Sequence, residues 1–496
     1  MKRILPIFIA FVACQTYANI KMPLIFNEDN DRFFIYSKPE DISEQGLRKY
    51  INQLKGGNVT HFFMCPNGQR TSFKSKAHEA IWECAPDAPH RCIWCDNAKK
   101  LHDNGIDPYA VWIDECRKQN ISPWITMRMN DIHFAPIKGY FRNMDFWRNN
   151  RQLWRNPNTS SSENWTEYAF DYSKKEVRDF QFSLIEELFE RYDFDGFELD
   201  WMRFPAHLTP QKGREQAYIL TEFMHKVRAV ADKWENKRNH KIKISVRVPA
   251  TIENSNFLGL DAVSWANLGY VDIIVPSNFY HTIDFDMPID KWKDAVSKTS
   301  VKIIPSCDNG VQCSSKATRS PTSLPIIRGW ATNCYARGAD GLYLFNIAYS
   351  PDMQKEIALH GLTPKLATDN QRRHLLTFHD YLEYESIADK KECLPAKTPC
   401  SLKVFIGAKP QNNNKIFVVI GSTSAPKNIQ LKLNGKDATK IEKAPLSKDK
   451  YGNANFINCF EINHQNVKAN YNEIFITTDS PVDIMWCEID IQNNQK

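Results

Sequence analysis

The feature that most constrains the fold is a regular alternation of short apolar runs and helical stretches between Arg32 and Asn346. The runs are rich in Val, Ile, Phe and Tyr, which favour strands. Eight can be counted: Phe33–Tyr36, Val59–Met64, Trp124–Met129, Gly196–Trp201, Ile242–Val248, Val271–Pro276, Val301–Pro305 and Gly341–Phe345. Eight strand–helix repeats predict an α/β fold, a closed (β/α)8 or TIM barrel. An open doubly wound sheet is the alternative, but no Gly-x-Gly-x-x-Gly follows the first run.

The character of the chain changes near Leu366. Strand-like runs such as Lys415–Ile420 and Val482–Ile489 are joined there by Asn-, Lys- and Pro-rich turns, with little helical periodicity. We therefore expect a barrel over residues 30–365 and a small β-sandwich over residues 366–496. We expect the sandwich to be a packing domain, and carbohydrate binding is the alternative role.

Residues 1–18 have the organisation of a signal peptide: a basic start, an apolar segment from Ile4 to Ala13 and a small-residue cleavage site. Phe11–Cys14 also loosely resembles a bacterial lipobox, which would place a lipid anchor on Cys14. The sequence therefore predicts a secreted or periplasmic protein, or alternatively an outer-membrane lipoprotein. No apolar run after residue 20 approaches the ~18 residues of a membrane-spanning helix.

Thirteen cysteines fit a chain that leaves the cytoplasm. Two close pairs and one cluster could form cross-links: Cys307/Cys313, Cys393/Cys400, and Cys84 with Cys92 and Cys95. His90 could complete a zinc site with that cluster, but in an exported protein we expect disulfides or free thiols instead. No metal and no other cofactor is predicted.

The net charge of +6 arises from 64 basic and 58 acidic residues that are well mixed along the chain. Proteins that bind nucleic acid usually concentrate their basic residues on one face or in one tract. The sequence therefore does not predict a nucleic-acid partner.

The most informative stretch is Asp195-Gly-Phe-Glu-Leu-Asp-Trp-Met-Arg-Phe-Pro205. Because side chains alternate along a strand, Glu198 and Asp200 should face the barrel interior, and Phe197, Leu199 and Trp201 the surrounding helices. Carboxylates inside a barrel are costly unless they are paired or used, and these two stand near the carboxyl end of the strand, where barrel enzymes place their chemistry. The alternative is that interior arginines pair with both and merely fix the packing of the strand.

Polar residues near other strand ends complete a predicted cup. Arg128 and Asn130 share one face of their run, and Arg247 lies on the inward face of Ile242–Val248. An arginine beside a carboxylate keeps it ionised, which suits a nucleophile and a structural pair equally well. Further candidates for substrate binding are Arg203, Asn278, Tyr280, His281 and Asn346. Amides, carboxylates and aromatic rings together are the mixture that binds a sugar.

The eight-strand layout, Tyr168-Ala-Phe-Asp-Tyr172 and the Asp195–Pro205 motif resemble the glycosyl-hydrolase-like family labelled family 10-like. That resemblance covers roughly residues 30 to 350 and implies a secreted bacterial TIM barrel, often followed by a β-sandwich. The family usually has His where this chain has Glu198. The strand is also similar to the Asp-Gly-x-Asp-x-Asp-x-Glu strand of family 18 chitinases, but Met202 replaces the acid Glu there, and a thioether cannot donate a proton.

The sequence thus predicts a glycoside hydrolase that acts on a polysaccharide or glycoconjugate with two carboxyl groups. Asp200 is the expected ionised partner, and the candidates for the acid are Glu198, Glu253 and Asp308, in that order. A non-catalytic carbohydrate-binding barrel is the alternative function. A metal-dependent hydrolase is disfavoured because no His-x-His pattern follows any strand.

Overall fold

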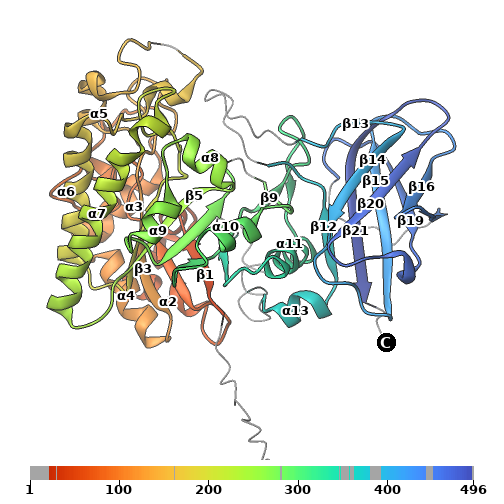
Figure 1. Ribbon diagram of the computed structural model, residues 1–496. Coiled ribbons are helices and arrows are strands. Elements are labelled where there is room, and N and C mark those ends of the chain that lie inside the picture. Colours follow the sequence, from red (N-terminus) through yellow and green to blue (C-terminus); the bar gives the residue numbers. More distant parts are fainter. Residues whose placement is uncertain are drawn as a thin grey trace, which may run out of the picture.

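The computed structural model describes residues 22–29, 31–160, 162–279, 282–345, 347, 357, 362–379, 392–442 and 451–493. The predicted signal segment, with Cys14, lies outside these residues. The described chain forms a helix-covered barrel followed by a β-sandwich (Figure 1). No helix in these ranges is both long and apolar enough to cross a lipid bilayer.

The barrel consists of eight parallel strands, the seventh of which is divided into two short segments. The strands are β1 (Leu24–Glu28), β2 (His61–Met64), β3 (Ser122–Arg128), β4 (Gly196–Asp200), β5 (Lys243–Pro249), β6 (Ile273–Ser277), β7 (Lys302–Ile303) with β8 (Ser306–Cys307), and β11 (Leu342–Leu344). β7 pairs with β6, β8 pairs with β11, and β11 pairs with β1. The two segments of one strand therefore close the sheet, which confirms the predicted (β/α)8 barrel.

Pro305 explains why the seventh strand is divided. Ile304, on its amino side, donates its N–H to the Ile274 carbonyl of β6 at 3.0 Å. Pro305 has no N–H to donate, and its carbonyl accepts from Tyr343 N of β11 at 2.9 Å. The strand thus changes its main partner at the proline.

The predicted first strand is wrong: Phe33–Tyr36 lies in helix α1 (Arg32–Tyr36), and the first strand is β1, earlier in the chain. Phe33 and Phe34 are both buried, which a strand with one face toward the core does not allow and a helix does. A run of four apolar residues cannot be assigned by periodicity. As a consequence, Asp29 and Asp31 lie at the carboxyl end of a barrel strand.

Helices form the outer layer of the barrel (Figure 1). The longer ones are α2 (Glu44–Asn52), α3 (Ile93–Asp103), α4 (Pro108–Lys118), α6 (Lys175–Arg191), α7 (Gly213–Arg238) and α11 (Leu324–Ala336); the shorter ones are α5 (Asp145–Asn149), α8 (Ile252–Phe257), α9 (Ala262–Asn267) and α10 (Ile289–Ala295). Asp107 caps α4 by accepting from two backbone N–H groups. At α6, Lys174 occupies the N-cap position and makes no side-chain cap bond.

Aromatic rings fill the lower part of the barrel interior. Phe63 stacks on Trp124 with ring centroids 4.6 Å apart and meets the Tyr343 ring edge-on at 5.5 Å. A Cβ at Gly196 would lie 2.4 Å from the Trp124 indole, so glycine is required there. These rings occupy the interior below the carboxyl ends of the strands, which are the usual place for a binding site in such a barrel.

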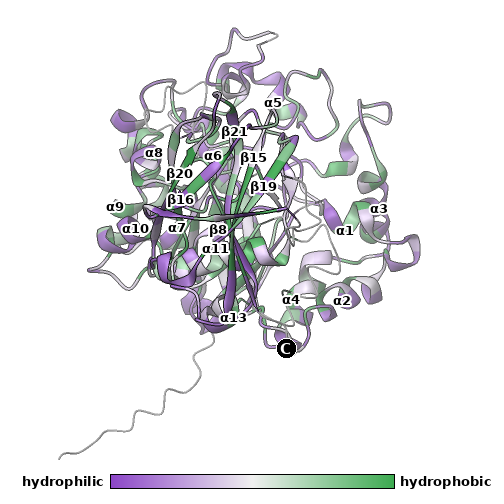
Figure 2. Cartoon of the chain, turned by 90° about the vertical axis from the view of Figure 1, so that its right-hand side faces the viewer, coloured by the Kyte–Doolittle hydropathy of each residue, from purple (hydrophilic) through white to green (hydrophobic). Residues whose placement is uncertain are grey.

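The C-terminal body is the predicted β-sandwich of two antiparallel sheets. One contains β12 (Arg372–Leu375), β13 (Ala396–Lys397), β15 (Asn414–Ser422), β18 (Thr439–Ile441), β19 (Phe456–Glu461) and β21 (Asp483–Asn493); the other contains β14 (Cys400–Phe405), β16 (Gln430–Leu433), β17 (Lys436–Asp437) and β20 (Tyr471–Thr477). Figure 2 shows apolar and polar segments along these strands, as expected for strands with one face in the core. The predicted division at residue 366 falls inside α13 (Pro364–Asp369).

The sandwich packs against the barrel through β12 and α11. A Cβ at Gly329 of α11 would lie 1.9 Å from the Arg373 carbonyl of β12, so the helix and the strand approach backbone to backbone. Asn333 of the same helix donates to the Phe285 carbonyl of the barrel and to the Phe405 carbonyl of the sandwich, each at 2.9 Å. One buried side chain thus bonds to both bodies.

Of the two outcomes expected for the cysteines, disulfides or free thiols, the described chain shows no disulfide at the candidate pairs. In the pair Cys307/Cys313, the two residues have different surroundings. Cys307 lies in β8 of the barrel, whereas Cys313 lies near the Arg373–Glu488 ion pair of the sandwich. Cys84 and Cys95 come nearest to a cross-link, with their sulfur atoms 3.9 Å apart.

Candidate active site

The alternation predicted for β4 is confirmed. On the outward face, Phe197 packs against Phe189 of α6, with ring centroids 5.1 Å apart. On the inward face, Glu198 and Asp200 bond only to groups of the barrel interior and of the turn after β4. The strand therefore carries two carboxyl groups to the barrel axis, one layer apart.

The two oxygens of Asp200 have different surroundings. Oδ1 accepts three N–H groups, from Arg247 Nε at 3.0 Å and from the backbone of Met202 and Arg203 at 3.0 and 3.1 Å. Oδ2 accepts one, from Arg247 Nη2 at 3.1 Å. The carboxylate is thus anchored through one oxygen and keeps hydrogen-bonding capacity on the other. Its side chain is 4% exposed.

Glu198 lies one layer deeper and is sealed from solvent, with 0% exposure. It accepts from the hydroxyls of Thr126 at 2.7 Å, Ser245 at 2.9 Å and Tyr343 at 2.8 Å. Burial, followed by the negative charge of Asp200, raises the pKa of Glu198 to about 7. A group enclosed in this way cannot reach a sugar, so we assign Glu198 a positioning role beneath Asp200.

Arg247 bridges Asp200 to an aromatic ring. Its guanidinium lies 4.0 Å from the centroid of Phe345, the residue that follows β11. Burial alone would lower the pKa of Arg247, but the Asp200 carboxylate outweighs it and the pKa is raised. Arg247 therefore remains charged and keeps Asp200 in one orientation.

Arg128 makes a second set of ion pairs at the mouth of the barrel. Its guanidinium donates to Asp29, which follows β1, and to Asp131 Oδ2 at 2.8 Å. Burial alone would lower the pKa of Arg128, but the attraction of these carboxylates is stronger, so the pKa is raised well above its ordinary value. Arg128 thus faces the interior as predicted, but it pairs with Asp29 and Asp131 and not with β4.

His133 links the Arg128 cluster to Arg203. Arg203 Nη2 lies 2.9 Å from His133 Nε2, and because arginine can only donate, Nε2 accepts. His133 Nδ1 therefore carries the proton and donates to Asp131 Oδ1 at 2.7 Å. Burial, with Arg203 nearby, lowers the pKa of His133 to about 4, so the ring is neutral at pH 7.

Asp31, which the sequence did not indicate, is a further carboxyl group at the mouth. Arg142 Nη2 donates to its Oδ2 at 3.2 Å, whereas its Oδ1 is buried and has no hydrogen-bond partner. Burial and the neighbouring Asp29 raise the pKa of Asp31. Its side chain is 17% exposed. Asp31 is therefore a partly exposed carboxyl group whose pKa is shifted upward and whose Oδ1 has no hydrogen-bond partner in the described chain.

Three half-buried aromatic rings gather beside this cluster. Trp165 lies 5.4 Å from Phe204 and 5.1 Å from Phe279, measured between ring centroids. Phe204 has a φ of +64°, which is uncommon for a bulky residue and directs the chain after β4 back toward the mouth. Rings that border carboxylates and guanidinium groups form a surface suited to the apolar face of a sugar.

The remaining predicted site residues have other positions or lie outside the described chain. Asn130 binds the backbone of Phe170 and Ala206 and so holds two loops together. Glu253 is exposed in the first turn of α8, and Asp308 bonds to Arg319 at 3.2 Å. Asn278 has a buried Oδ1 without a partner. Tyr280, His281 and Asn346 are outside the described residues.

Some residues of this site could have been found from sequence. Asp131 and His133 follow directly on Arg128 and Asn130, and extending the predicted strand by four residues would have included them. Asp29 and Asp31 could not be recognised as residues at a strand end, because the first strand was predicted at Phe33–Tyr36 and not at Leu24–Glu28.

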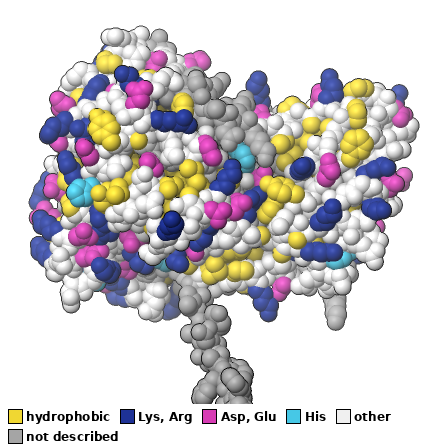
Figure 3. Space-filling view, in the orientation of Figure 1, with side chains coloured by type: hydrophobic (Ala, Val, Ile, Leu, Met, Phe, Trp, Pro, Cys, Tyr) yellow, Lys and Arg dark blue, Asp and Glu magenta, His cyan; other side chains and the backbone are white. Residues whose placement is uncertain are grey.

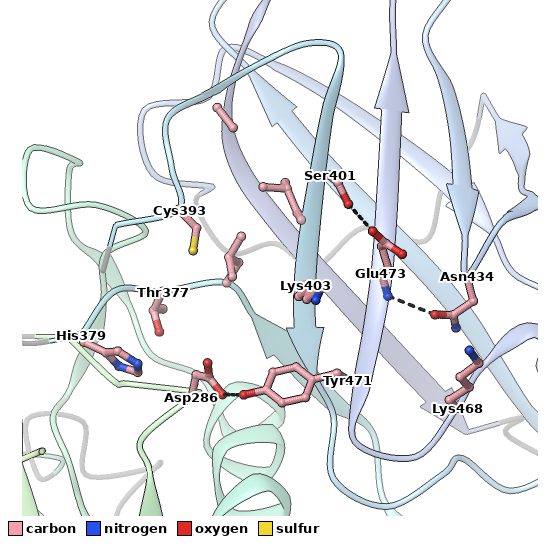
Figure 4. A pocket seen from close by; sticks show the side chains of 13 residues that line it. Asp286, Thr377, His379, Cys393, Ser401, Lys403, Asn434, Lys468, Tyr471 and Glu473 are labelled. Carbon is pink, nitrogen blue, oxygen red and sulfur yellow. Dashed lines mark hydrogen bonds between the residues drawn. The ribbon is translucent and has the colours of Figure 1, made fainter. Parts of the chain in front are cut away.

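A hollow of about 860 Å³ lies between the sandwich and the barrel (Figure 4). Tyr471 and Glu473 project into it from β20, and Asp286 comes from the loop before α10. The Asp286 carboxylate accepts from the Tyr471 hydroxyl at 2.6 Å, and Glu473 accepts from Ser401 at 2.6 Å. Because these carboxylates serve to hold the junction and the sheet, we place the candidate active site at the barrel mouth.

Charges on the surface are mixed. On the face drawn in Figure 3, basic and acidic side chains alternate over the barrel and the sandwich, with hydrophobic side chains between them. This face therefore offers no continuous basic surface of the kind that binds nucleic acid.

Neither protein-family models nor curated proteins give a match to this chain. The family 10-like and family 18 resemblances therefore remain predictions.

Solved structures of carbohydrate-active enzymes resemble the chain over most of its length. A cycloisomaltooligosaccharide glucanotransferase from a Paenibacillus species has 9% identity and a TM-score of 0.35, covering 94% of this chain and 57% of that one. A GH36 α-galactosidase from Geobacillus stearothermophilus has 12% identity and a TM-score of 0.38, covering 95% and 55%. A second GH36 α-galactosidase of that organism has 10% identity and a TM-score of 0.39, covering 92% and 56%.

The chain spans little more than half the length of these enzymes. At such identities and TM-scores the likeness assigns no function, so the residues of the barrel mouth carry the functional argument.

Proposed function

We propose that the protein is a glycoside hydrolase whose active site is the mouth of the barrel, with Asp200 as the ionised carboxylate. The observation that carries this is the unequal bonding of Asp200, where Oδ1 accepts three donors and Oδ2 accepts one. The remaining capacity of Oδ2 is free to attack an anomeric carbon or to stabilise positive charge that develops there.

Asp31 is the proposed general acid, in place of Glu198, Glu253 and Asp308. A glycosidase acid must hold a proton near neutral pH and must reach the leaving oxygen. Burial and Asp29 raise the pKa of Asp31, which favours the acid role, and its Oδ1 has no hydrogen-bond partner in the described chain that would compete with a substrate. Glu198 holds a proton but is sealed, and Glu253 is an exposed residue of α8.

In the proposed reaction, the sugar at the cleavage point packs against the rings of the mouth, with its anomeric carbon facing Asp200 Oδ2. Arg247 fixes that carboxylate and balances its charge. Asp31 donates its proton to the glycosidic oxygen as the bond breaks, and then as a carboxylate accepts a proton from the incoming water.

The role of Asp31 is tested by the leaving-group dependence of the Asp31→Asn variant. Loss of a general acid slows the cleavage of alkyl glycosides, whereas 4-nitrophenyl glycosides need little protonation. We expect Asp31→Asn to retain most activity on whichever 4-nitrophenyl glycoside the wild type cleaves, and to lose about 10²- to 10⁴-fold on the matching methyl glycoside.

Asp437→Asn, an exposed carboxylate of the sandwich, is the matched control and should behave as wild type on both substrates. Equal losses of Asp31→Asn on the two substrates would contradict the acid role.

A non-catalytic carbohydrate-binding barrel is the second candidate. The observation that favours it is that the carboxylates of Asp29, Asp31, Asp131 and Asp200 each have an arginine partner, as in a purely structural network. Such a protein would bind glycans but release no reducing sugar, even with the wild-type chain at high concentration.

A further inference from the structure

Arg203 is a guanidinium group at the barrel mouth that has no carboxylate partner in the part of the chain that the structure describes. Its backbone N–H is bound to Asp200, but its side chain makes only one hydrogen bond within those residues, to neutral His133. Its Nε is buried without a partner. His133 and the rings of Phe345 and Phe204 therefore fix the guanidinium in place, with its Cζ 5.8 Å from the centroid of Phe345 and 5.9 Å from that of Phe204. None of these groups neutralises its charge.

The other arginines of the mouth have carboxylate partners. Arg128 pairs with Asp29 and Asp131, Arg142 pairs with Asp31, and Arg247 pairs with Asp200. These pairs occupy the acidic groups described at the mouth and leave none of them in contact with Arg203.

The electrostatics show the same contrast. The pKa values of Arg128 and Arg247 are raised by their carboxylates. That of Arg203 is lowered, because burial and the charges of Arg128 and Arg247 outweigh those of Asp29 and Asp131, neither of which forms an ion pair with it in the described chain.

A buried charge without a counterion is costly, and such groups in clefts are usually completed by a ligand. His133 cannot supply the missing charge, because its ring is neutral and its Nε2 only accepts a hydrogen bond. The planar guanidinium matches a carboxylate in shape and can bind it through two parallel hydrogen bonds. Asp200 lies in the same turn, three residues before Arg203, so the missing anion belongs close to the reacting carbon.

We propose that the substrate is the glycoside of a uronic acid, whose carboxylate binds the guanidinium of Arg203. This rests on the proposed function, and it names the class of sugar that occupies the site next to Asp200. A neutral sugar would leave the Arg203 charge without compensation, so the site discriminates against it.

The test is a binding measurement by titration calorimetry on the full chain. The ligands are the methyl glycosides of glucuronic acid and galacturonic acid, their neutral counterparts glucose and galactose, and the 6-sulfates of those neutral glycosides. We expect at least one uronide to bind about tenfold or more tightly than its neutral counterpart, as for a charge-assisted hydrogen bond. Arg203→Gln should reduce that preference to less than twofold, and Arg203→Lys should keep part of it.

Arg214→Gln is the matched control, since Arg214 is an exposed residue of α7 without an ion pair in the described chain. It should retain the full preference. Melting temperatures of the variants are compared first, and Arg203→Lys provides the readout if Arg203→Gln does not fold.

The possible failures are distinguishable. Equal binding of uronides and neutral glycosides by the wild type, or an undiminished preference in Arg203→Gln, would overturn the uronic acid assignment and leave a glycosidase of neutral sugars. A preference for the 6-sulfates alone would replace the carboxylate with a sulfate and also overturn it. Binding of none of these glycosides, together with no hydrolysis of any glycan by the wild type, would overturn the proposed function itself.

Discussion

Glu198 and Asp200 are two residues apart on one strand, yet their surroundings give them different tasks. Asp200 is paired with Arg247 and receives two backbone N–H groups from the turn after β4. Glu198 is surrounded by hydroxyl groups. We therefore propose the catalytic role for Asp200, at the end of the strand, and a positioning role for Glu198, which lies one layer deeper.

The buried Glu198 predicts how stability depends on pH. Its pKa is raised from 4.5 to about 7 on folding, so the folded state binds more protons than the unfolded state between these values. The contribution of Glu198 to the free energy of unfolding should fall by about 3 kcal/mol as pH rises from 4.5 to 7, whereas buried histidines such as His133, whose pKa is lowered to about 4, contribute with the opposite sign. Glu28, whose pKa burial raises to about 8, should extend the fall.

The measurement is urea unfolding at a series of pH values. The difference in unfolding free energy between the wild type and Glu198→Gln should change by about 3 kcal/mol between pH 4.5 and 7, whereas for Glu461→Gln, at an exposed glutamate of β19, it should stay constant. A profile of Glu198→Gln that superimposes on that of the wild type would contradict the pKa shift.

For single residues, the sequence predicted correctly the positions that follow from the alternation of side chains along a strand. Alternation along β4 and β5 correctly brought Asp200 and Arg247 to the same interior. It could not show that Arg128 pairs with Asp29, because that contact depends on barrel closure. Nor could it show that Asn130 binds loop backbone, because the loops have no regular pattern.

Among the elements, the strands that carry the proposed chemistry were predicted most accurately. β3, β4 and β5 lie within one or two residues of their predicted runs, because each is a buried run, and β3 and β4 end in the charged residues Arg128 and Asp200. The first strand was missed, since Leu24–Glu28 carries Asn27 and Glu28 and is too short to stand out. That single error hid Asp29 and Asp31, two of the carboxyl groups of the proposed mouth.

Gly329 offers a test of how closely the elements approach at the junction. Alanine is the better helix former by about 1 kcal/mol, so a helix without neighbours would gain from Gly329→Ala. In this chain the added Cβ would lie 1.9 Å from the Arg373 backbone, so β12 has to move off α11. We expect a net loss of about 3 kcal/mol in the free energy of unfolding.

The comparison is Ala336→Gly at the end of the same helix, which should lose about 1 kcal/mol from helix propensity alone. Denaturant unfolding with both variants measures the difference. A Gly329→Ala chain that is as stable as the wild type would show that helix and strand are not in backbone contact.

At the scale of the whole molecule, the sandwich and the barrel are joined by buried polar groups. Asn333 donates to a carbonyl of each body, and its Oδ1 lies 3.0 Å from His374 Nδ1 of β12. Arg337 of the same helix region binds Asp286 and Tyr471 across the junction. This supports the prediction that the sandwich packs on the barrel, although the pattern of these contacts could not be deduced from sequence.

Asn333→Ala should weaken the coupling of the two bodies. It leaves the Phe285 and Phe405 carbonyls buried without this donor, which should cost about 3 kcal/mol. Scanning calorimetry should then show a lower melting temperature and a broadened or divided transition. Asn455→Ala, which removes one bond at an exposed site, should leave the transition almost unchanged. An Asn333→Ala trace identical to that of wild type would contradict this role.

The most direct test of the proposed chemistry is the hydrolysis of a glycan panel by the wild-type chain and by Asp200→Asn, with binding measured in parallel. We expect the wild type to release reducing sugar from at least one uronic acid glycoside or neutral glycoside. We also expect Asp200→Asn to lose about 10³-fold or more of that rate while still binding the substrate. Hydrolysis that continues undiminished in Asp200→Asn, or a wild-type chain that binds glycans and cleaves none, would contradict the central claim.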